Sequence, residues 1–184
     1  MKKILTLMLL ISSPCIFAQS QNFEGFGLSL DYAVNEIVDT STPGSAVSNR
    51  SGIPSITVDA YKAVTDNWLL GVYGNYDLGT TDTAGSDPDA HHPIEAGGRV
   101  GYAINEKWMA YAKLGWSWSK YSSPGYYSWM NGPSYGLGVQ YMITNNLFTR
   151  LEVSQQNYKT ITWSDNSTDK VNINSYGVSI GWRF

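Results

Sequence analysis

Apolar side chains alternate with small or polar ones along the last nine residues of the chain. The apolar residues occupy alternate positions, and they are Tyr176, Val178, Ile180, Trp182 and Phe184. Glycine, serine and arginine occupy the positions of the other parity, between them. Because successive side chains of a β-strand point to opposite faces, the pattern predicts a strand with one aromatic, apolar face. Soluble proteins seldom end on such a face, whereas a strand within a lipid bilayer needs one.

The same alternation recurs in seven earlier segments of the chain. Their apolar faces cover residues 26–34, 56–60, 68–78, 94–104, 108–118, 135–143 and 147–153. The connections between them alternate in length, with short turns at 65–67, 105–107 and 144–146 and long loops at 35–52, 79–93, 119–133 and 159–170. Short turns at one end and long loops at the other are typical of barrels that cross a membrane. We therefore predict an all-β fold, an eight-stranded antiparallel up-and-down transmembrane β-barrel.

Aromatic residues gather at two heights of the predicted strands, all with the apolar parity. Trp68, Trp108 and Trp182 lie near short turns or the chain end, whereas Tyr76 and Trp118 lie toward the long loops. Such belts favour the two interfaces of a bilayer. A soluble barrel such as a lipocalin is the alternative, with the apolar face turned inward. A cylinder of eight strands has little room for so many tryptophans, which argues against it.

The N-terminus has the pattern of a secretory signal peptide. Lys2 and Lys3 precede an apolar run that ends near Ala18, and the run is too short for a membrane helix. We predict a signal peptide at 1–18 and a barrel domain at 19–184, with cleavage after Ser20 as the alternative. The only cysteine, Cys15, follows a proline, so a lipoprotein signal is disfavoured. A mature chain without cysteine has no disulfide to stabilise it.

Charge and hydropathy exclude other classes of protein. The chain has 12 basic and 15 acidic residues, and loss of two lysines with the signal peptide changes the net charge from −3 to −5. An acidic chain without basic clusters is a poor nucleic-acid binder. No later stretch approaches the roughly 18 apolar residues of a membrane helix. We expect no cofactor.

Three segments resemble the eight-stranded outer-membrane β-barrel family, which includes the OmpA membrane domain, OmpX/Ail proteins and opacity-type surface proteins. They are the final strand with Tyr176, Val178, Ile180, Trp182 and Phe184, the turn at 65–68 and the segment at 151–154. The resemblance implies a monomer in the outer membrane of a Gram-negative bacterium, surrounded by outer-membrane lipid and lipopolysaccharide. It also implies that the final strand, ending on Phe184, is the signal read by the barrel-assembly machinery.

Charged residues collect on the parity that faces the barrel interior. They are Asp59, Glu95, Arg99, Lys113, Arg150 and Glu152. Buried charges without partners cost several kcal/mol, so we expect them to pair. Our hypothesis joins Arg99 to Glu152 or Glu95. Two roles remain open, a structural network that fills the barrel and a switchable gate in a small ion path.

The long loops carry the candidates for surface contacts. The aromatic candidates are Tyr121, Tyr126, Tyr127, Trp129 and Trp163. Aromatic residues favour recognition surfaces, but these could also extend the strands or contact lipopolysaccharide. The loops carry a small negative charge, which argues against heparin-type adhesion.

Two adjacent histidines, His91 and His92, fall beside Asp87 and Asp89 in the second long loop. Such side chains can bind a divalent metal, although a solvated loop is the simpler interpretation. Because no histidine falls on a predicted strand, a Ser-His-acid site is not supported and we expect no enzyme. The sequence favours a structural and surface-interaction, adhesin-like role, with a host or environmental surface ligand as the candidate partner. A narrow pore for ions or small solutes is the alternative.

Overall fold

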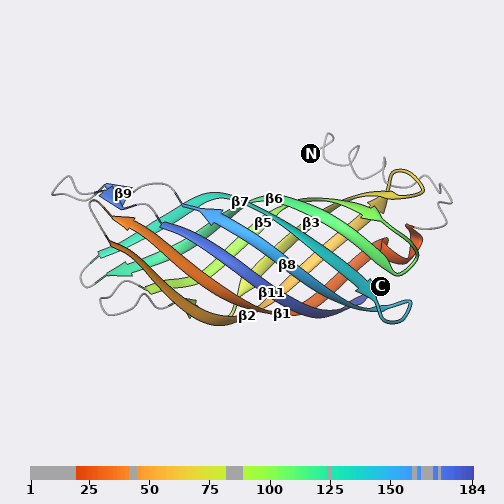
Figure 1. Ribbon diagram of the computed structural model, residues 1–184, viewed down its shortest axis with the longest axis horizontal. Coiled ribbons are helices and arrows are strands. Elements are labelled where there is room, and N and C mark those ends of the chain that lie inside the picture. Colours follow the sequence, from red (N-terminus) through yellow and green to blue (C-terminus); the bar gives the residue numbers. More distant parts are fainter. Residues whose placement is uncertain are drawn as a thin grey trace, which may run out of the picture.

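A computed structural model describes residues 20–184, except for 42–44, 82–88, 124–125, 159–160, 163–167 and 170. Within these residues, eight long strands form a closed antiparallel barrel (Figure 1). They are β1 (Gly25–Ser41), β2 (Ser45–Ala63), β3 (Trp68–Asp77), β5 (Asp89–Ala103), β6 (Trp108–Ser123), β7 (Tyr126–Met142), β8 (Leu147–Asn157) and β11 (Val171–Arg183). Pairing of β1 with β11 and of β3 with β5 closes the cylinder. The predicted fold class is confirmed.

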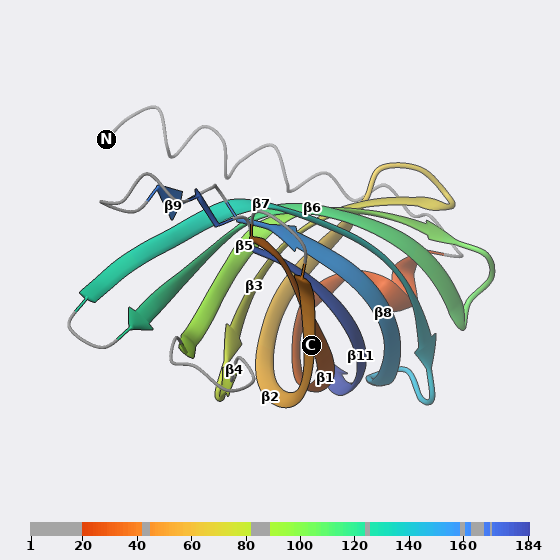
Figure 2. The same ribbon diagram turned by 60° about the vertical axis from the view of Figure 1, so that its left-hand side comes forward.

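Four short elements complete the described part of the chain. A 3-10 helix, η1 (Gln21–Phe23), precedes the barrel, and β4 (Thr80–Thr81) pairs with β5. β9 (Ile161–Thr162) and β10 (Thr168–Asp169) pair with each other at the long-loop end (Figures 1 and 2). A search of the described residues for a helix long and apolar enough to cross a membrane found none.

The two faces of the barrel differ as the alternation predicts. On the last strand Tyr176, Ile180 and Trp182 are 55%, 53% and 46% exposed, while Ser179 and Arg183, at alternate positions to them, are buried. The apolar parity therefore faces outward along β11, and the other long strands follow the same rule. A lipocalin-like interior is thus contradicted, because the apolar side chains lie on the outer surface.

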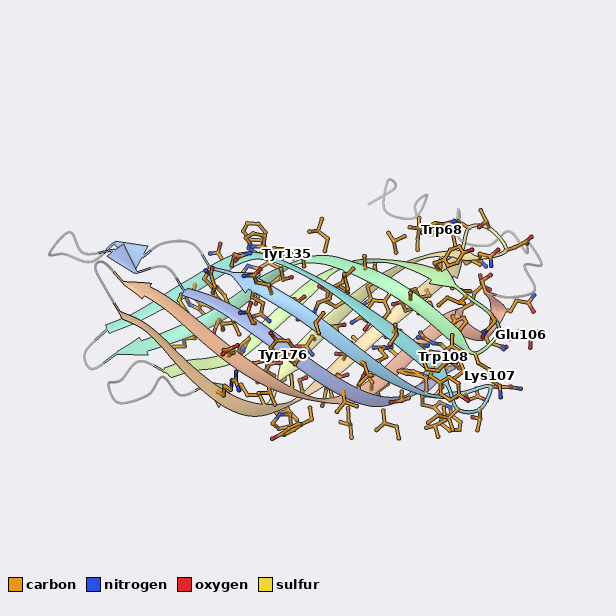
Figure 3. The ribbon with its side chains drawn as sticks, in the orientation of Figure 1. Trp68, Glu106, Lys107, Trp108, Tyr135 and Tyr176 are labelled. Atoms are coloured by element: carbon orange, nitrogen blue, oxygen red, sulfur yellow. The ribbon has the colours of Figure 1, made fainter. Side chains whose placement is uncertain are left out.

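Aromatic side chains mark both ends of this outer surface. Trp68 and Trp108 lie near the turn that holds Glu106 (Figure 3). The Trp68 ring packs edge-on against Tyr102 at 5.0 Å between centroids. Tyr135 and Tyr176 lie farther toward the long-loop end (Figure 3). An apolar band between two aromatic belts is the surface that a bilayer requires.

The short turns are built alike, which explains the repeat in the sequence. In the first, the Thr65 hydroxyl accepts a hydrogen bond of 3.0 Å from the Trp68 N–H. Thr144 holds the last turn in the same way through the Leu147 N–H, also at 3.0 Å. In the middle turn the side chain of Asn105 takes the place of the threonine. Each turn thereby holds its hairpin in register.

Two of the predicted long loops are mostly strand. β1 and β2 stay paired up to Ser41 and Ser45, and β6 and β7 up to Ser123 and Tyr126. The prediction of loops at 35–52 and 119–133 is therefore wrong. Apolar alternation ends where the predicted lipid-facing surface ends, but backbone hydrogen bonds continue because they need no apolar side chains.

The second long loop also needs a correction. β5 begins at Asp89, so His91 and His92 lie on a strand, with His91 opposite Lys120 of β6. The loop prediction for 79–93 missed this pairing because the segment lacks an apolar face. The metal interpretation of His91 and His92 stays a prediction, because Asp87 and the side chains of Asp89 and of both histidines lie outside the described residues. Among the side chains that are described, no three of His, Cys, Asp or Glu are placed to hold a metal ion.

An apolar cluster fills the barrel at the short-turn end. Its members are all buried, and they are Phe23, Tyr61, Leu69, Ala103, Met109, Tyr111, Met142 and Phe148. The η1 segment carries Phe23 into this cluster, and Asn22 ties it to the turn by donating a 3.0 Å hydrogen bond to the Glu106 carbonyl. The chain then enters β1 through Gly25, whose φ of +97° favours glycine. η1 therefore covers this end of the barrel (Figure 2).

Candidate functional site

Asp59 lies at the centre of a charged cluster inside the barrel. Its side chain is fully buried and contacts three guanidinium groups from three other strands. Arg150 and Arg99 meet one carboxylate oxygen, Arg99 at 3.4 Å, and Arg183 meets the other. Alternation turns all four side chains inward, and strand register brings them to one height. One carboxylate therefore joins β2, β5, β8 and β11.

A second part of the cluster is centred on Lys113. Its ammonium group lies 2.7 Å from Glu152 and 3.1 Å from Glu95. Glu152 also contacts Arg99 at 3.1 Å and accepts a 2.8 Å hydrogen bond from the Tyr111 hydroxyl. Because Arg99 touches both Asp59 and Glu152, the two parts form one continuous network.

Neutral donors surround the remaining carboxylate. Glu95 accepts hydrogen bonds from the hydroxyl groups of Tyr73 and Ser134, the latter at 2.8 Å. The Gln156 amide donates to its other oxygen at 3.4 Å. A buried carboxylate is tolerated when several donors replace the water it has lost.

Aromatic rings cover the arginines. The Arg99 guanidinium lies 4.5 Å from the ring centre of Tyr73 and 4.9 Å from that of Tyr111. Arg150 lies 4.4 Å from the ring centre of Phe148. Such cation–π contacts contribute about 0.5–1 kcal/mol each at exposed sites and about 2 kcal/mol when desolvated.

Glycines on the neighbouring strands make room for these rings. A Cβ atom added at Gly138 would lie 2.4 Å from the Tyr111 hydroxyl, and one at Gly181 would lie 2.4 Å from the Phe148 ring. Glycine at these positions lets the aromatic side chains cross the lumen. The inward glycines thus belong to a packed interior in this half of the barrel.

All six inward charges named from the sequence lie in this network. Arg99 pairs with Glu152, as one of the two hypotheses stated, whereas Glu95 pairs with Lys113. Sequence reasoning missed Arg183, although its parity in the last strand could have revealed it. It also missed the inward tyrosines, whose alternate spacing with the charges was a usable signal.

A polar cavity of about 60 Å³ lies beside the network, toward the long loops. Arg99, Lys113, Arg150 and Glu152 border it on the side of the short turns. Carboxylate, amide and hydroxyl groups line the rest, and they include Asp31, Asn35, Ser55, Thr57, Asn75, Asp77, Gln156, Ser175 and Ser179. Such a space is large and polar enough to hold water molecules.

The surface candidates are only partly described. Trp129 is 68% exposed on β7. Tyr121, Tyr126 and Tyr127 lie on the extended β6–β7 hairpin, where the backbone alone is described. Trp163 lies outside the described residues.

The final strand is joined to the first over its whole length. Phe184 donates its backbone N–H to the Phe26 carbonyl at 2.8 Å, and the two rings lie 6.2 Å apart. The five residues of the assembly-signal prediction, Tyr176, Val178, Ile180, Trp182 and Phe184, all lie exposed on the outer face. Their role in assembly stays a prediction.

Comparison with solved structures finds the same fold in several outer-membrane proteins. Ail, the attachment invasion locus protein of Yersinia pestis, is 18% identical with a TM-score of 0.56, over 88% of this chain and 99% of that one. The Neisserial surface protein NspA is 16% identical with a TM-score of 0.57, over 88% and 98%. OprG of Pseudomonas aeruginosa is 13% identical with a TM-score of 0.54, over 88% and 96%. At these identities the likeness shows the fold alone.

Sequence comparison supplies the family. A search of curated proteins gave no match. The profile of the outer membrane protein beta-barrel domain matches residues 4–184, nearly the whole chain. The chain therefore belongs to the outer membrane protein beta-barrel domain family.

Proposed function

We propose that this protein is a closed, non-conducting barrel in the outer membrane of a Gram-negative bacterium, acting at the cell surface through its long-loop end. The main support is the filled lumen, in which the Asp59 network and the apolar cluster around Phe23 lie one above the other. Ions crossing this lumen would have to displace paired charges and then an apolar layer, and both steps are costly. We propose no enzymatic role.

The surface role rests on the hairpin of β6 and β7, which extends beyond the apolar face and exposes Trp129. A large exposed aromatic side chain on a paired hairpin beyond the apolar face suits contact with a ligand or with lipopolysaccharide. The solved structures include Ail of Yersinia pestis in complex with the heparin analogue sucrose octasulfate. For this chain, whose loops carry negative charge, we propose a ligand other than a sulfated polysaccharide.

Single-channel recording tests the closed lumen. The mature protein and a variant with both Arg99→Ala and Arg150→Ala are refolded and placed in planar bilayers. The wild type is expected to stay closed, and the double variant to leak because the network is broken. Trp129→Ala serves as the control and stays closed. Stable, ion-selective openings of the wild type would instead support a narrow pore, the alternative that the 60 Å³ polar cavity favours.

Binding assays test the surface role. Proteoliposomes carrying wild type or Trp129→Ala are compared on lipopolysaccharide bilayers and on cultured epithelial cells. Loss of binding with Trp129→Ala, but not with the lipid-facing control Leu137→Ala, is the expected result. Equal binding by all three proteins would contradict a role for the β7 end of the hairpin.

A further inference from the structure

The side chain of Arg183, at the end of β11, uses only part of its hydrogen-bonding capacity. Its Nη1 group donates to Asp59 and, at 3.2 Å, to the Gly25 carbonyl. Its Nε and Nη2 atoms are buried and have no hydrogen-bond partner among the described residues, and Arg183 as a whole is only 3% exposed. The hydrogens of Nε and Nη2 lie along one edge of the planar guanidinium, so a single acceptor can serve both. Buried donors without an acceptor destabilise the folded state.

Carboxylates are too few around Arg183. Within the described barrel, Asp59 is the only carboxylate that contacts either Arg150 or Arg183. The third arginine of the cluster, Arg99, has Glu152 as a further partner. Since arginine stays charged in proteins, Asp59 leaves at least one positive charge of Arg150 and Arg183 without its opposite. Protonation of Asp59 would only increase this excess.

The acidic residues that line the polar cavity do not supply the missing charge by direct contact. Asp31 and Asp77 both lie opposite Ser55 of β2, and Asp59 follows four residues later in that strand. Four residues correspond to about 13 Å along a strand. Arg183 lies in the row of Asp59, because Gly27 of β1 pairs with both residues. It is therefore far from both acids, and it is not among the residues that line the cavity.

Aromatic side chains surround the guanidinium. The Arg183 Cζ atom lies 5.2 Å from the ring centres of both Tyr61 and Phe148. Both rings belong to the apolar cluster at the short-turn end, which also contains Phe23 of η1. In such surroundings the dielectric constant is low, so an opposite charge beside a cation stabilises it more than it would in water.

We propose that the Nε–Nη2 edge of Arg183 binds one monatomic anion, with chloride as the physiological ligand. The ion accepts both hydrogen bonds and offsets the positive charge that Asp59 leaves. A water molecule accepts the same hydrogen bonds but supplies no charge. Because β11 pairs with β1 at this row, the ion stabilises the junction at which the barrel closes.

Unfolding by urea at constant ionic strength tests the proposal, with chloride replacing gluconate, an anion too large for the site. A ligand that binds only the folded state raises its stability as the ligand concentration rises. For the mature protein in lipid vesicles, we expect the folding equilibrium constant to increase about tenfold for each tenfold increase of chloride above its dissociation constant, as one bound ion requires. Bromide is expected to act like chloride, whereas acetate is expected to have much less effect.

Matched variants locate the site. Arg183→Lys keeps the positive charge but removes the Nε–Nη2 edge, and we expect it to lose the chloride dependence. Arg50→Lys makes the same change in the exposed pair with Glu36 and is expected to keep that dependence. Gel mobility with and without heating confirms that each variant has folded. Wild-type crystals soaked in bromide are expected to show an anomalous peak beside Nε and Nη2 of Arg183.

Other outcomes would overturn the proposal. Wild-type stability that does not change with chloride would mean that water occupies the position. Equal chloride dependence in Arg183→Lys would place the anion elsewhere, and an equal effect of acetate would rule out a monatomic ligand. If Arg183→Lys does not fold, the bromide crystals still decide, because absence of a peak at Arg183 contradicts the site. None of these readouts depends on conductance or surface adhesion, so either proposal can fail without the other.

Discussion

The two halves of the barrel interior are built differently although the same strands line both. In the short-turn half, arginines, tyrosines and Phe148 fill the lumen, and glycines on neighbouring strands give way to them. In the long-loop half, serines, threonines and amides line a cavity of about 60 Å³. An inward glycine therefore has two different structural roles. In the short-turn half it accommodates an aromatic ring, and in the long-loop half it leaves open space.

The largest expected effect comes from removing the carboxylate shared by three arginines. Asp59→Ala leaves those buried charges without their common partner, so we expect the free energy of unfolding to fall by about 3–5 kcal/mol. Urea unfolding in lipid vesicles measures this change. Asp31→Ala, in the cavity half, is the control and should cost much less. Equal losses would show that the two halves do not differ in the energy of their charges.

A smaller effect is expected from the hydroxyl group of Tyr111. Tyr111→Phe removes its 2.8 Å hydrogen bond to Glu152, and hydrogen bonds to charged groups contribute about 1.5–3 kcal/mol. The same unfolding measurement applies, with the outward-facing Tyr176→Phe as control. A negligible loss would mean that Arg99 and Lys113 alone satisfy Glu152.

Two glycines of β11 test the comparison within one strand. An added Cβ at Gly181 meets the Phe148 ring at 2.4 Å and the Leu28 carbonyl at 2.6 Å. Since overpacking typically costs about 1–3 kcal/mol, Gly181→Ala should destabilise the barrel by that amount. Thermal unfolding followed by gel mobility detects the loss. Wild-type stability of this variant would show that the short-turn half can relax.

The smallest effect is expected four residues earlier in the same strand. Gly177→Ala adds a methyl group where the cavity has room, so its stability should stay within about 0.5 kcal/mol of wild type. The same gel assay, run beside Gly181→Ala, provides the comparison. A loss as large as that of Gly181→Ala would contradict the assignment of Gly177 to open space.

Much of the fold could be predicted because the bilayer imposes a strong pattern. Strands that face lipid need apolar side chains over the full height of the apolar band on the outer surface. The alternation in the strand ending at Phe184 and in its neighbours therefore predicts these strands. The extended hairpins at Ser41 and Ser123 could not be predicted, because their strands continue beyond that pattern. The sequence predicts a loop at His91 for the same reason.

Side-chain partners in the lumen were less predictable than side-chain faces. The alternation of side chains predicts that Asp59, Arg99 and Glu152 point to the interior. The partner of Glu95, in contrast, depends on the stagger between strands. That stagger follows from barrel closure, and small errors in strand ends shift it by a residue or more. The convergence of three arginines on Asp59 therefore had no local signal.

Sequence by itself determined which side of each strand meets lipid, where the short turns lie and which charges enter the barrel. These properties depend on the alternation of side chains along a single strand, which is visible in the sequence without knowledge of the fold. Tertiary structure alone decided that Arg183 joins the network, that Phe23 covers the short-turn end and that a cavity remains beside Gly177. Each of these depends on distances between strands far apart in the sequence, which become defined only when β1 and β11 close the barrel.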